Sequence, residues 1–428
     1  MAQGKLGILV GGGPAPGINS VIGAATIRSL LEGVEVVGIK DGYEHIMKGV
    51  TDQVIPLTME RVSRIHYRGG SILGTARANP TKQAQTLETA LASIDKLGID
   101  KLISIGGDDT AFSAMKLAEK SQGRLRVVHV PKTIDNDLDL PPEIDTFGYQ
   151  TARSVGVEIA KNLMVDAHTT GRWYYVVAMG RTAGHLALGI GKAAGATMTV
   201  ISEEFGRKVT GKAIKMKTLV DTLAMAVAKR QSEGRKDGVA VIAEGVVLDI
   251  DPADLSALDG AERDEHGHVR ISEIDIGDIL KKAVLARLKQ LGIKSTIVSK
   301  NIGYELRCAD PVPADMEYTR DLGYCAAKVL VSGGHSLMVS MQGGRFVPVP
   351  FSKMIDPTTG RTKVRLVDIH SERYAIARRY MIRLRRDDFE QPEVLGRIAK
   401  TCGMTVEEFK QEFEYLVQTE LPALTLQR

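Results

Sequence analysis

Two short segments of the chain combine acidic side chains, one lysine and glycines in a pattern suited to phosphate chemistry. The first is Gly106-Gly107-Asp108-Asp109-Thr110, and the second is Lys132-Thr133-Ile134-Asp135-Asn136-Asp137. Each follows a short apolar stretch that we expect to be a buried strand, so their carboxylates, ammonium group and bare backbone amides are expected in one cleft. Such a set of groups could move a phosphoryl group from a metal-bound donor to a hydroxyl.

The first segment predicts a site for a metal-bound phosphate. Its glycines let a phosphate chain approach the backbone, and Asp108 can hold Mg²⁺ directly or through water. The adjacent Asp109 needs a cation or a lysine nearby, because like charges side by side are costly. A helix N-cap would explain only one of the two aspartates.

The second segment predicts the groups that carry out the transfer. Asp135 and Asp137 lie two residues apart, so one can accept a proton while the other supports a metal or the neighbouring backbone. Thr133 can bond the acceptor sugar or the transferred phosphate. Lys132 supplies a charge for oxygens that become more negative as the bridging bond breaks. An Asx-rich turn without function is the alternative.

A third glycine-rich segment, Gly11-Gly12-Gly13-Pro14-Ala15-Pro16-Gly17, follows the first expected strand and opens a helix. Bare amides at a helix N-terminus form an anion site. The segment matches neither G-x-G-x-x-G nor the Walker A pattern, so a tight strand-to-helix turn is the alternative interpretation.

The elements that position these segments alternate along the chain. Apolar runs predict strands at 6–10, 34–39, 101–105, 126–130, 174–178, 197–201 and 239–243. Helical periods cover 18–31, 81–97, 110–119, 155–164 and 212–230. This alternation predicts an α/β fold with mainly parallel sheets covered on both faces.

We expect a first lobe at residues 1–146, to which the chain returns around 305–345, and a second lobe at 147–304. Residues 346–428 form a mostly helical C-terminal extension, and residues 249–270 an exposed loop or hairpin. An arginine-rich helix is expected at 371–386. Its arginines are interpreted as solvated or as part of a subunit interface: Arg378, Arg379, Arg383, Arg385 and Arg386.

Composition excludes several classes of protein. The net charge of +4 over 428 residues gives no general signal for polyanion binding. Three cysteines without a CxxC pair argue against a zinc ribbon or a disulfide framework, and we expect them to be packing residues. With no membrane-spanning apolar run and no signal-peptide pattern, a soluble, cytoplasmic protein is expected. Trp173 is expected in the core.

These segments resemble the phosphofructokinase family, in order, to about residue 345. The resemblance includes Gly69-Gly70, Gly74-Thr75-Ala76-Arg77, Met179-Gly180-Arg181, Glu244-Gly245 and Tyr304-Glu305-Leu306-Arg307. It implies two Rossmann-like lobes, a homodimer or homotetramer that completes the active site across subunits, and reversible Mg²⁺-dependent phosphorylation of the 1-hydroxyl of fructose 6-phosphate to fructose 1,6-bisphosphate.

Two positions bear on the phosphoryl donor. ATP-using members of the family normally have glycine where this chain has Asp109 and Lys132, and this pair is typical of the pyrophosphate-dependent branch. A carboxylate at position 109 would repel the α-phosphate of a nucleotide, and Lys132 would neutralise the leaving orthophosphate. ATP as donor on the same fold is the alternative.

The resemblance also implies roles for individual residues. Gly12 and Arg77 would hold pyrophosphate, Asp108 its Mg²⁺, and Asp135 would be the general base, with Asp109 and Lys132 also catalytic. The residues implied to bind the sugar phosphate are Thr133, Asp137, Met179, Gly180, Arg181, Glu244, Tyr304 and Arg307. Arg172 would reach the substrate of a neighbouring subunit.

Two departures from the family pattern stand out. Tyr304 stands where many bacterial ATP enzymes have histidine, and Gly11 and Pro14 stand where serine and aspartate are common. Two other classes remain as alternatives. NAD and lipid kinases share a GGDG-type turn but lack the other segments, and a non-catalytic sugar-phosphate sensor would have no use for the base Asp135.

Overall fold

The computed structural model describes residues 4–206, 211–256, 274–356, 358, 362–418 and 420. The chain divides into two compact units, each built from two stretches of sequence. Unit 1 comprises Met1–Ser154 and Tyr304–Arg365, and unit 2 comprises Val155–Gly303 and Leu366–Arg428. The first division falls after residue 154 rather than 146, inside helix α5 (Tyr149–Thr170). The segment expected as a C-terminal extension is shared between the units.

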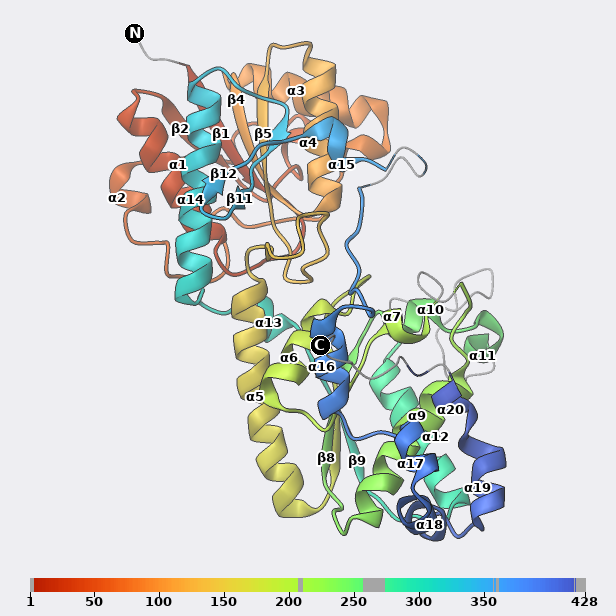
Figure 1. Ribbon diagram of the computed structural model, residues 1–428. Coiled ribbons are helices and arrows are strands. Elements are labelled where there is room, and N and C mark those ends of the chain that lie inside the picture. Colours follow the sequence, from red (N-terminus) through yellow and green to blue (C-terminus); the bar gives the residue numbers. More distant parts are fainter. Residues whose placement is uncertain are drawn as a thin grey trace, which may run out of the picture. The chain divides into compact units, whose positions relative to one another are not determined.

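Unit 1 is built on a sheet of seven strands among the described residues, in the order β13-β10-β5-β4-β1-β2-β3. Figure 1 labels the central strands β5, β4, β1 and β2. The strands are β1 (Lys5–Val10), β2 (Glu35–Ile39), β3 (Val54–Pro56), β4 (Lys101–Gly106), β5 (Arg126–Pro131), β10 (Leu337–Met338) and β13 (Val349–Pro350). Only the two edge strands pair antiparallel. Strands β1 and β4 are almost wholly buried, because helices cover both faces of a parallel sheet.

The helices of unit 1 form the outer layers. The helices are α1 (Ile18–Leu31), α2 (Met59–Val62), α3 (Ala84–Lys96), α4 (Asp108–Ser121), α13 (Tyr304–Arg307), α14 (Pro313–Val331) and α15 (Phe351–Met354). Helices α1 and α14 pack together on one face of the sheet, and α3 and α4 lie on the other (Figure 1). The short hairpin β11 (Met341–Gln342) and β12 (Arg345–Phe346) lies outside the main sheet.

Unit 2 has its own parallel sheet of four strands within the described ranges, in the order β7-β8-β6-β9. The strands are β6 (Trp173–Ala178), β7 (Met198–Val200), β8 (Gly238–Ala243) and β9 (Ile297–Ile302). The longer helices are α5, α6 (His185–Ala194), α9 (Met216–Ser232) and α12 (Ile276–Gln290). Trp173 is fully buried, as expected.

All seven predicted strands are present, and the α/β fold class is confirmed. Strand β9 was missed because its sequence, Ile-Val-Ser-Lys-Asn-Ile, has a polar centre that lacks the apolar signal of a buried strand. It lies at the edge of its sheet, where Lys300 and Asn301 are exposed to solvent.

The C-terminal part of unit 2 consists of five helices in the residues that the structure describes. They are α16 (Glu372–Tyr380), α17 (Arg386–Glu390), α18 (Pro392–Thr401), α19 (Val406–Phe413) and α20 (Tyr415–Gln418). The predicted single helix at 371–386 is therefore wrong. It stops at Tyr380, and the following residues run extended beside the edge strand β7, where Ile382 N–H donates to the carbonyl of Thr197 at 2.8 Å.

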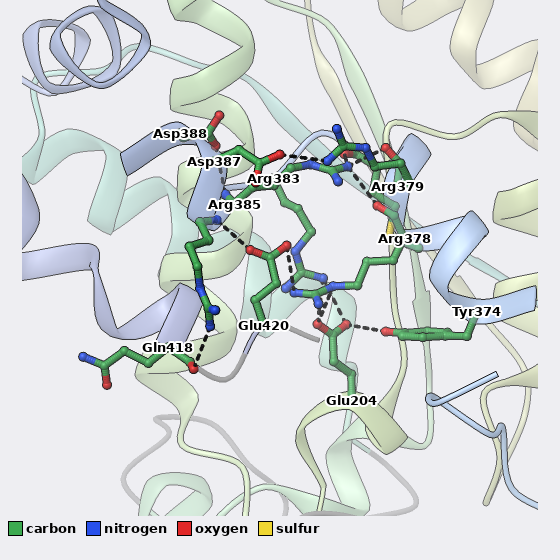
Figure 2. Close-up of polar contacts among 12 residues, drawn as sticks. Glu204, Tyr374, Arg378, Arg379, Arg383, Arg385, Asp387, Asp388, Gln418 and Glu420 are labelled. Atoms are coloured by element: carbon green, nitrogen blue, oxygen red, sulfur yellow. Dashed lines mark hydrogen bonds and ion pairs between the residues drawn. The ribbon is translucent and has the colours of Figure 1, made fainter. Parts of the chain in front are cut away.

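The interpretation of this arginine cluster as solvated is wrong for two of its members. Arg378 and Arg383 are only 8% and 4% exposed, and both face the carboxylate of Glu204, whose side chain is 10% exposed (Figure 2). Arg383 Nη1 lies 2.8 Å from Glu204 Oε1, Arg378 Nε lies 3.4 Å from the same oxygen, and the Tyr374 hydroxyl donates to Oε2 at 2.8 Å. Burial alone would raise the pKa of Glu204, but the guanidinium groups of Arg383 and Arg378 hold it below its ordinary value.

The structure also bears on the expected loop at 249–270, on the three cysteines and on membrane-spanning helices. Residues 257–270 of the expected loop or hairpin lie outside the described residues. In its described part the expectation is wrong, because helix α10 (Val246–Asp249) ends there and helix α11 (Pro252–Ser256) follows. The three cysteines are free, but Cys308 is exposed rather than packed. Among the described helices, no stretch has both the length and the apolar character needed to cross a bilayer.

Candidate functional site

The glycine-rich segment after β1 is held against the turn that carries Arg77. Gly11 N–H donates to the carbonyl of Ile105 and Gly12 N–H to that of Ala76, both at 2.8 Å. The hydroxyl of Thr75 donates to the carbonyl of Gly12 at 2.6 Å. These bonds bring residues 11–13 and the exposed Arg77 side chain to the carboxyl edge of the unit 1 sheet.

The second glycine-rich segment joins β4 to α4 at the same edge. Gly106 must be a glycine, because a β-carbon there would lie 2.4 Å from the side chain of Thr110. Asp108 and Asp109 fall in the first turn of α4, where the helix dipole favours negative charge. Asp109 is exposed, whereas Thr110 is buried.

Asp108 is a carboxylate of this edge whose pKa is strongly shifted. Its Oδ1 atom is buried and makes no hydrogen bond to any of the described residues. Burial, together with the charges of Asp137 and Asp109, raises the pKa of Asp108 to about 7. A cation beside the carboxylate would remove this cost, so the position fits Mg²⁺.

The donor set around Asp108 is sparse. The described residues contain no group of three or more His, Cys, Asp or Glu side chains arranged to hold a metal ion. Mg²⁺ usually binds through one or two carboxylates, waters and substrate phosphates rather than through an all-protein cage. The arrangement therefore fits a metal that arrives with a phosphate-containing substrate.

Lys132 reaches from the end of β5 to the glycine-rich segment after β1. Its side chain is buried, and Nζ donates a hydrogen bond to the carbonyl oxygen of Gly13. Burial lowers the pKa of Lys132 to about 8, and the nearby charges of Arg307 and Arg77 act in the same direction, whereas Asp135 opposes them. Three cationic side chains thus gather around residues 12 and 13, and an anion bound there would relieve their mutual repulsion.

The short helix α13 supplies the third of these cations. Arg307 Nη1 lies 3.2 Å from the position that a β-carbon on Gly13 would take. Its guanidinium carbon lies 4.6 Å from the ring centroid of the exposed Tyr304. Tyr304 and Arg307, which the family resemblance assigns to the sugar phosphate, thus belong to unit 1 and lie beside the glycine-rich segment.

The segment that contains Asp135 is a tight turn fixed by its own side chains. The Thr133 hydroxyl accepts the Asp135 N–H at 3.0 Å and donates to Asp137 Oδ1 at 3.2 Å. Asn136, between the two aspartates, has the left-handed backbone conformation with φ of 57°. Asp135 is near enough to Lys132 for their charges to interact.

A second group of predicted residues comes together in unit 2, at the carboxyl ends of the adjacent strands β6 and β8. Met179 N–H donates to the carbonyl of Ile302, and Glu244 N–H to that of Ala178, both at 3.0 Å. A β-carbon on Gly245 would lie 3.0 Å from the Gly180 carbonyl oxygen. Residues 179–181 and 244–245 therefore lie side by side, and the side chain of Arg181 is exposed.

Arg172 does not join this group within unit 2. It precedes β6, whereas Met179 follows it, so the two lie at opposite ends of a strand of six residues. Arg172 Nε lies 3.9 Å from Asp166 Oδ2. Arg172 therefore lies away from residues 179–181.

Two residues of unit 1 that the sequence did not indicate support the site. His129 is buried in β5, and its Nε2 lies 3.0 Å from the carbonyl oxygen of Gly106, at the start of the segment that carries Asp108. Burial lowers the pKa of His129 to about 3, so the ring is neutral and Nε2–H is the donor. Its only sequence signal is a histidine inside an apolar strand. The second residue, Arg365, contacts the turn after Asp135 and lies beyond every recognised motif.

Comparison with known proteins agrees with this geometry. The family model described as Phosphofructokinase matches residues 5–330. The chain is 52% identical to the pyrophosphate–fructose 6-phosphate 1-phosphotransferase of Thermotoga maritima, over 98% of this chain and 99% of that protein. It is 45% identical to the protein of the same name from Naegleria fowleri, over 96% of each chain.

A solved structure has the same fold. The pyrophosphate-dependent phosphofructokinase of Marinobacter aquaeolei aligns with a TM-score of 0.66, over 94% of this chain and 92% of that chain. At 14% identity, this likeness bears on the fold alone. The two close relatives and the family match confirm the resemblance found in the sequence. The chain belongs to the phosphofructokinase family.

Proposed function

We propose that the protein transfers a phosphoryl group from Mg-pyrophosphate to the 1-hydroxyl of D-fructose 6-phosphate. The products are fructose 1,6-bisphosphate and orthophosphate, and the reaction is reversible. The observation that carries this proposal is the buried Lys132, whose Nζ bonds the Gly13 carbonyl between Arg77 and Arg307. The names of the two close relatives support the same reaction.

The donor site is proposed at the carboxyl edge of the unit 1 sheet. Residues 12 and 13 and the side chains of Arg77 and Lys132 would hold the pyrophosphate oxygens. Lys132 would stabilise the negative charge that builds up on the leaving orthophosphate. Asp108 would hold Mg²⁺, which supplies charge neutralisation for the phosphate oxygens when it is bound.

The transfer itself is assigned to Asp135. The oxygen of the 1-hydroxyl forms a bond to the terminal phosphorus, the bridging P–O bond breaks, and orthophosphate leaves with the bonding electrons. The hydroxyl proton passes to the Asp135 carboxylate. The hydrogen bond from the Asp135 backbone N–H to the Thr133 hydroxyl supports this role, because it fixes the start of the turn.

The sugar phosphate is proposed to bind to the cluster in unit 2. Met179, Gly180, Arg181 and Glu244 converge at the ends of β6 and β8, which is where ligands bind in open parallel sheets. Unit 1 would then be the donor-binding part and unit 2 the sugar-phosphate-binding part. Arg172, Tyr304 and Arg307 are proposed as further phosphate contacts, with Arg172 acting in a neighbouring subunit.

The proposal also includes the oligomeric state and the cellular compartment of the enzyme. We propose a homodimer or homotetramer, because Arg172 lies away from its own subunit's cluster. Three free cysteines suit a reducing compartment such as the cytoplasm.

ATP as donor is less well supported. The exposed carboxylate of Asp109 starts the same helix as Asp108 and would repel the α-phosphate of a nucleotide. Lys132 occupies the space beside the glycine-rich segment with a long, charged side chain.

Initial rates on fructose 6-phosphate and Mg²⁺, with pyrophosphate and with ATP as alternative donors, test the proposal. We expect turnover with pyrophosphate and none with ATP. Turnover with ATP alone would overturn the assignment of pyrophosphate as the donor. It would not affect the assignment of Asp135 as the base. No turnover with either donor would overturn the proposed activity as a whole.

A further inference from the structure

Arg365 makes an unusual set of contacts in unit 1. Its guanidinium group donates hydrogen bonds to backbone carbonyl oxygens of the turn that follows Asp135. Nη1 lies 3.2, 2.8 and 2.9 Å from the carbonyl oxygens of Leu140, Pro141 and Ile144. Nε and Nη2 lie 3.3 and 3.1 Å from the carbonyl oxygen of Asn136. One side chain therefore satisfies four carbonyl groups of one loop.

The same arginine fixes the side chain of Asn136. Nη2 donates to Asn136 Oδ1 at 2.6 Å, and the same oxygen accepts the Thr146 N–H at 2.9 Å. Asn136 Nδ2 donates to Asp145 Oδ1 at 2.8 Å. Asn136 follows Asp135 directly and has a left-handed backbone conformation, with φ of 57°, which asparagine adopts more readily than most non-glycine residues.

Backbone contacts attach the segment of Arg365 to the same loop. Arg365 N–H donates to the carbonyl of Asp137 at 2.8 Å, and Val364 forms an isolated antiparallel bridge with Leu138. The segment thus runs alongside the residues that follow the base. A guanidinium group suits this position, because its five N–H donors lie in one rigid plane and can serve several acceptors at once.

The position of Arg365 in the sequence makes this role unexpected. The family model ends at residue 330, and every motif shared with the family precedes it. The contacts join residues 229 positions apart. Nothing in the local sequence around Arg365 indicates a link with residues 136–144.

We propose that Arg365 is a positioning residue for the phosphoryl transfer. It holds the loop 136–144 in one conformation, and through Asn136 it sets the direction in which the Asp135 carboxylate meets the acceptor hydroxyl. This inference rests on the proposed function, because it assigns Asp135 as the base. Arg365 is proposed to touch neither substrate, so its removal affects turnover more than substrate binding, although Asp137, which the resemblance assigns to the sugar phosphate, lies in the same loop.

Lys363 provides a matched control. It lies two residues earlier, is exposed, and its Nζ is 3.8 Å from the carboxylate of Asp139 in the same loop. Lys363→Gln therefore removes one positive charge beside the loop without removing a bond to its backbone. Arg365→Gln removes the charge and most of the donors.

The experiment combines two measurements on the full chain. Amide hydrogen exchange of the peptide covering 136–144 is measured without substrates, and kcat and KM are measured with Mg-pyrophosphate and fructose 6-phosphate. In Arg365→Gln we expect exchange to rise about tenfold or more, and kcat to fall about 10- to 100-fold, as is typical when a catalytic group is misplaced by ~1 Å. KM should stay within about threefold, and Lys363→Gln should match the wild type within about twofold in both measurements.

Chemical rescue separates positioning from general destabilisation. Added guanidinium should restore part of the turnover of Arg365→Ala at millimolar concentrations, while tetramethylammonium at the same ionic strength should not. If Arg365→Gln does not fold, Arg365→Lys is measured in its place, because an ammonium group keeps the charge but supplies only three donors.

Each of the following results would overturn the proposal. The first is unchanged kcat in a folded Arg365 variant, whether or not the loop exchanges faster. The second is an increase in KM without a loss of kcat, and the third is an equal effect of Lys363→Gln. If the wild type itself lacks pyrophosphate-dependent turnover, the proposed function fails instead, and the exchange of 136–144 still reports whether Arg365 holds the loop.

Discussion

The side-chain amine of Lys132 donates a hydrogen bond to the carbonyl oxygen of Gly13, 119 residues earlier in the chain. This contact joins the two segments that would hold the donor, one after β1 and one after β5. It also brings a positive charge to the side of Gly12, where a β-carbon would lie 3.5 Å from Lys132 Nζ. A short donor of high negative charge, such as pyrophosphate, fits such a position better than the middle of a nucleoside triphosphate.

The first prediction concerns the choice of donor. Replacing both Asp109 and Lys132 by glycine should lower kcat/KM for pyrophosphate by about 10²- to 10³-fold, the usual effect of losing a group that stabilises developing charge, here Lys132. The measurement is the initial rate with pyrophosphate and with ATP. Lys116→Ala is the control, because Lys116 lies on the same helix α4 and its ammonium group contacts Glu119 and the Phe112 ring rather than the glycine-rich segments. Full pyrophosphate activity in the double variant would contradict the argument about the donor.

The second prediction concerns the base. Asp135→Asn should reduce kcat by about 10²- to 10⁴-fold, because the 1-hydroxyl then has no group to accept its proton. Binding of fructose 6-phosphate, measured by calorimetry, should change little. Asp139→Asn removes an exposed carboxylate from the same loop and should leave kcat near the wild-type value. Unchanged turnover in Asp135→Asn would exclude this residue as the base.

The third prediction concerns folding stability and Asp108. Its pKa of about 7 in the folded state lies above the value of about 3.9 expected in the unfolded chain. The folded state therefore binds the proton more tightly than the unfolded chain does. Above pH 7 the carboxylate is ionised in both states, and its burial then lowers the free energy of unfolding by the full amount. This cost shrinks as the pH falls from 7 towards 4, by up to about 1.4 kcal/mol per pH unit.

Urea unfolding without Mg²⁺ tests this directly. Asp108→Asn should be more stable than the wild type at pH 8, and the difference should decrease as the pH falls below 7. His129 has the opposite effect: because its pKa is lowered in the folded state, stability is lost as the pH falls below about 6.5. This loss is the same in the wild type and in Asp108→Asn, so it cancels when the two proteins are compared. Mg-pyrophosphate should raise the unfolding midpoint of the wild type and have a much smaller effect on Asp108→Asn. If the difference in stability between the two proteins did not change with pH, Asp108 would not have the raised pKa.

The fourth prediction concerns Glu204 in unit 2. Glu204→Gln should lower the free energy of unfolding by about 3–5 kcal/mol, because Arg378 and Arg383 would remain buried without an opposing charge. Asp387→Asn is the matched control. It breaks an ion pair with Arg379 in which both side chains are more than half exposed, so it should cost at most ~1 kcal/mol. Chemical denaturation of the three proteins at pH 7 gives the comparison, and equal stabilities would contradict it.

The parts of the fold that could be predicted are those with a local signal. Continuous apolar runs located the seven buried strands; Gly106 ends one of them, β4, and Lys132 directly follows another, β5. The active-site segments of unit 1 could be predicted because the carboxyl ends of parallel strands meet at one edge of a sheet.

The remaining features depend on contacts between distant residues. Nothing near Arg383 reveals that its guanidinium group is buried, because the compensating carboxylate, Glu204, lies 179 residues away. The helix expected at 371–386 ends at Tyr380 because the next residues bond the edge of a sheet. His129 gave only a weak signal, since one polar residue in a strand does not show what it contacts.

The contacts of Arg365 have a practical consequence for anyone who shortens this chain. A version cut at residue 330 would keep the whole family match, and a version cut at 345 would keep every motif from which the activity can be recognised. Both would lose the arginine that supports the loop after Asp135. A sequence search would still identify either product as a phosphofructokinase, although we expect both to be poor catalysts.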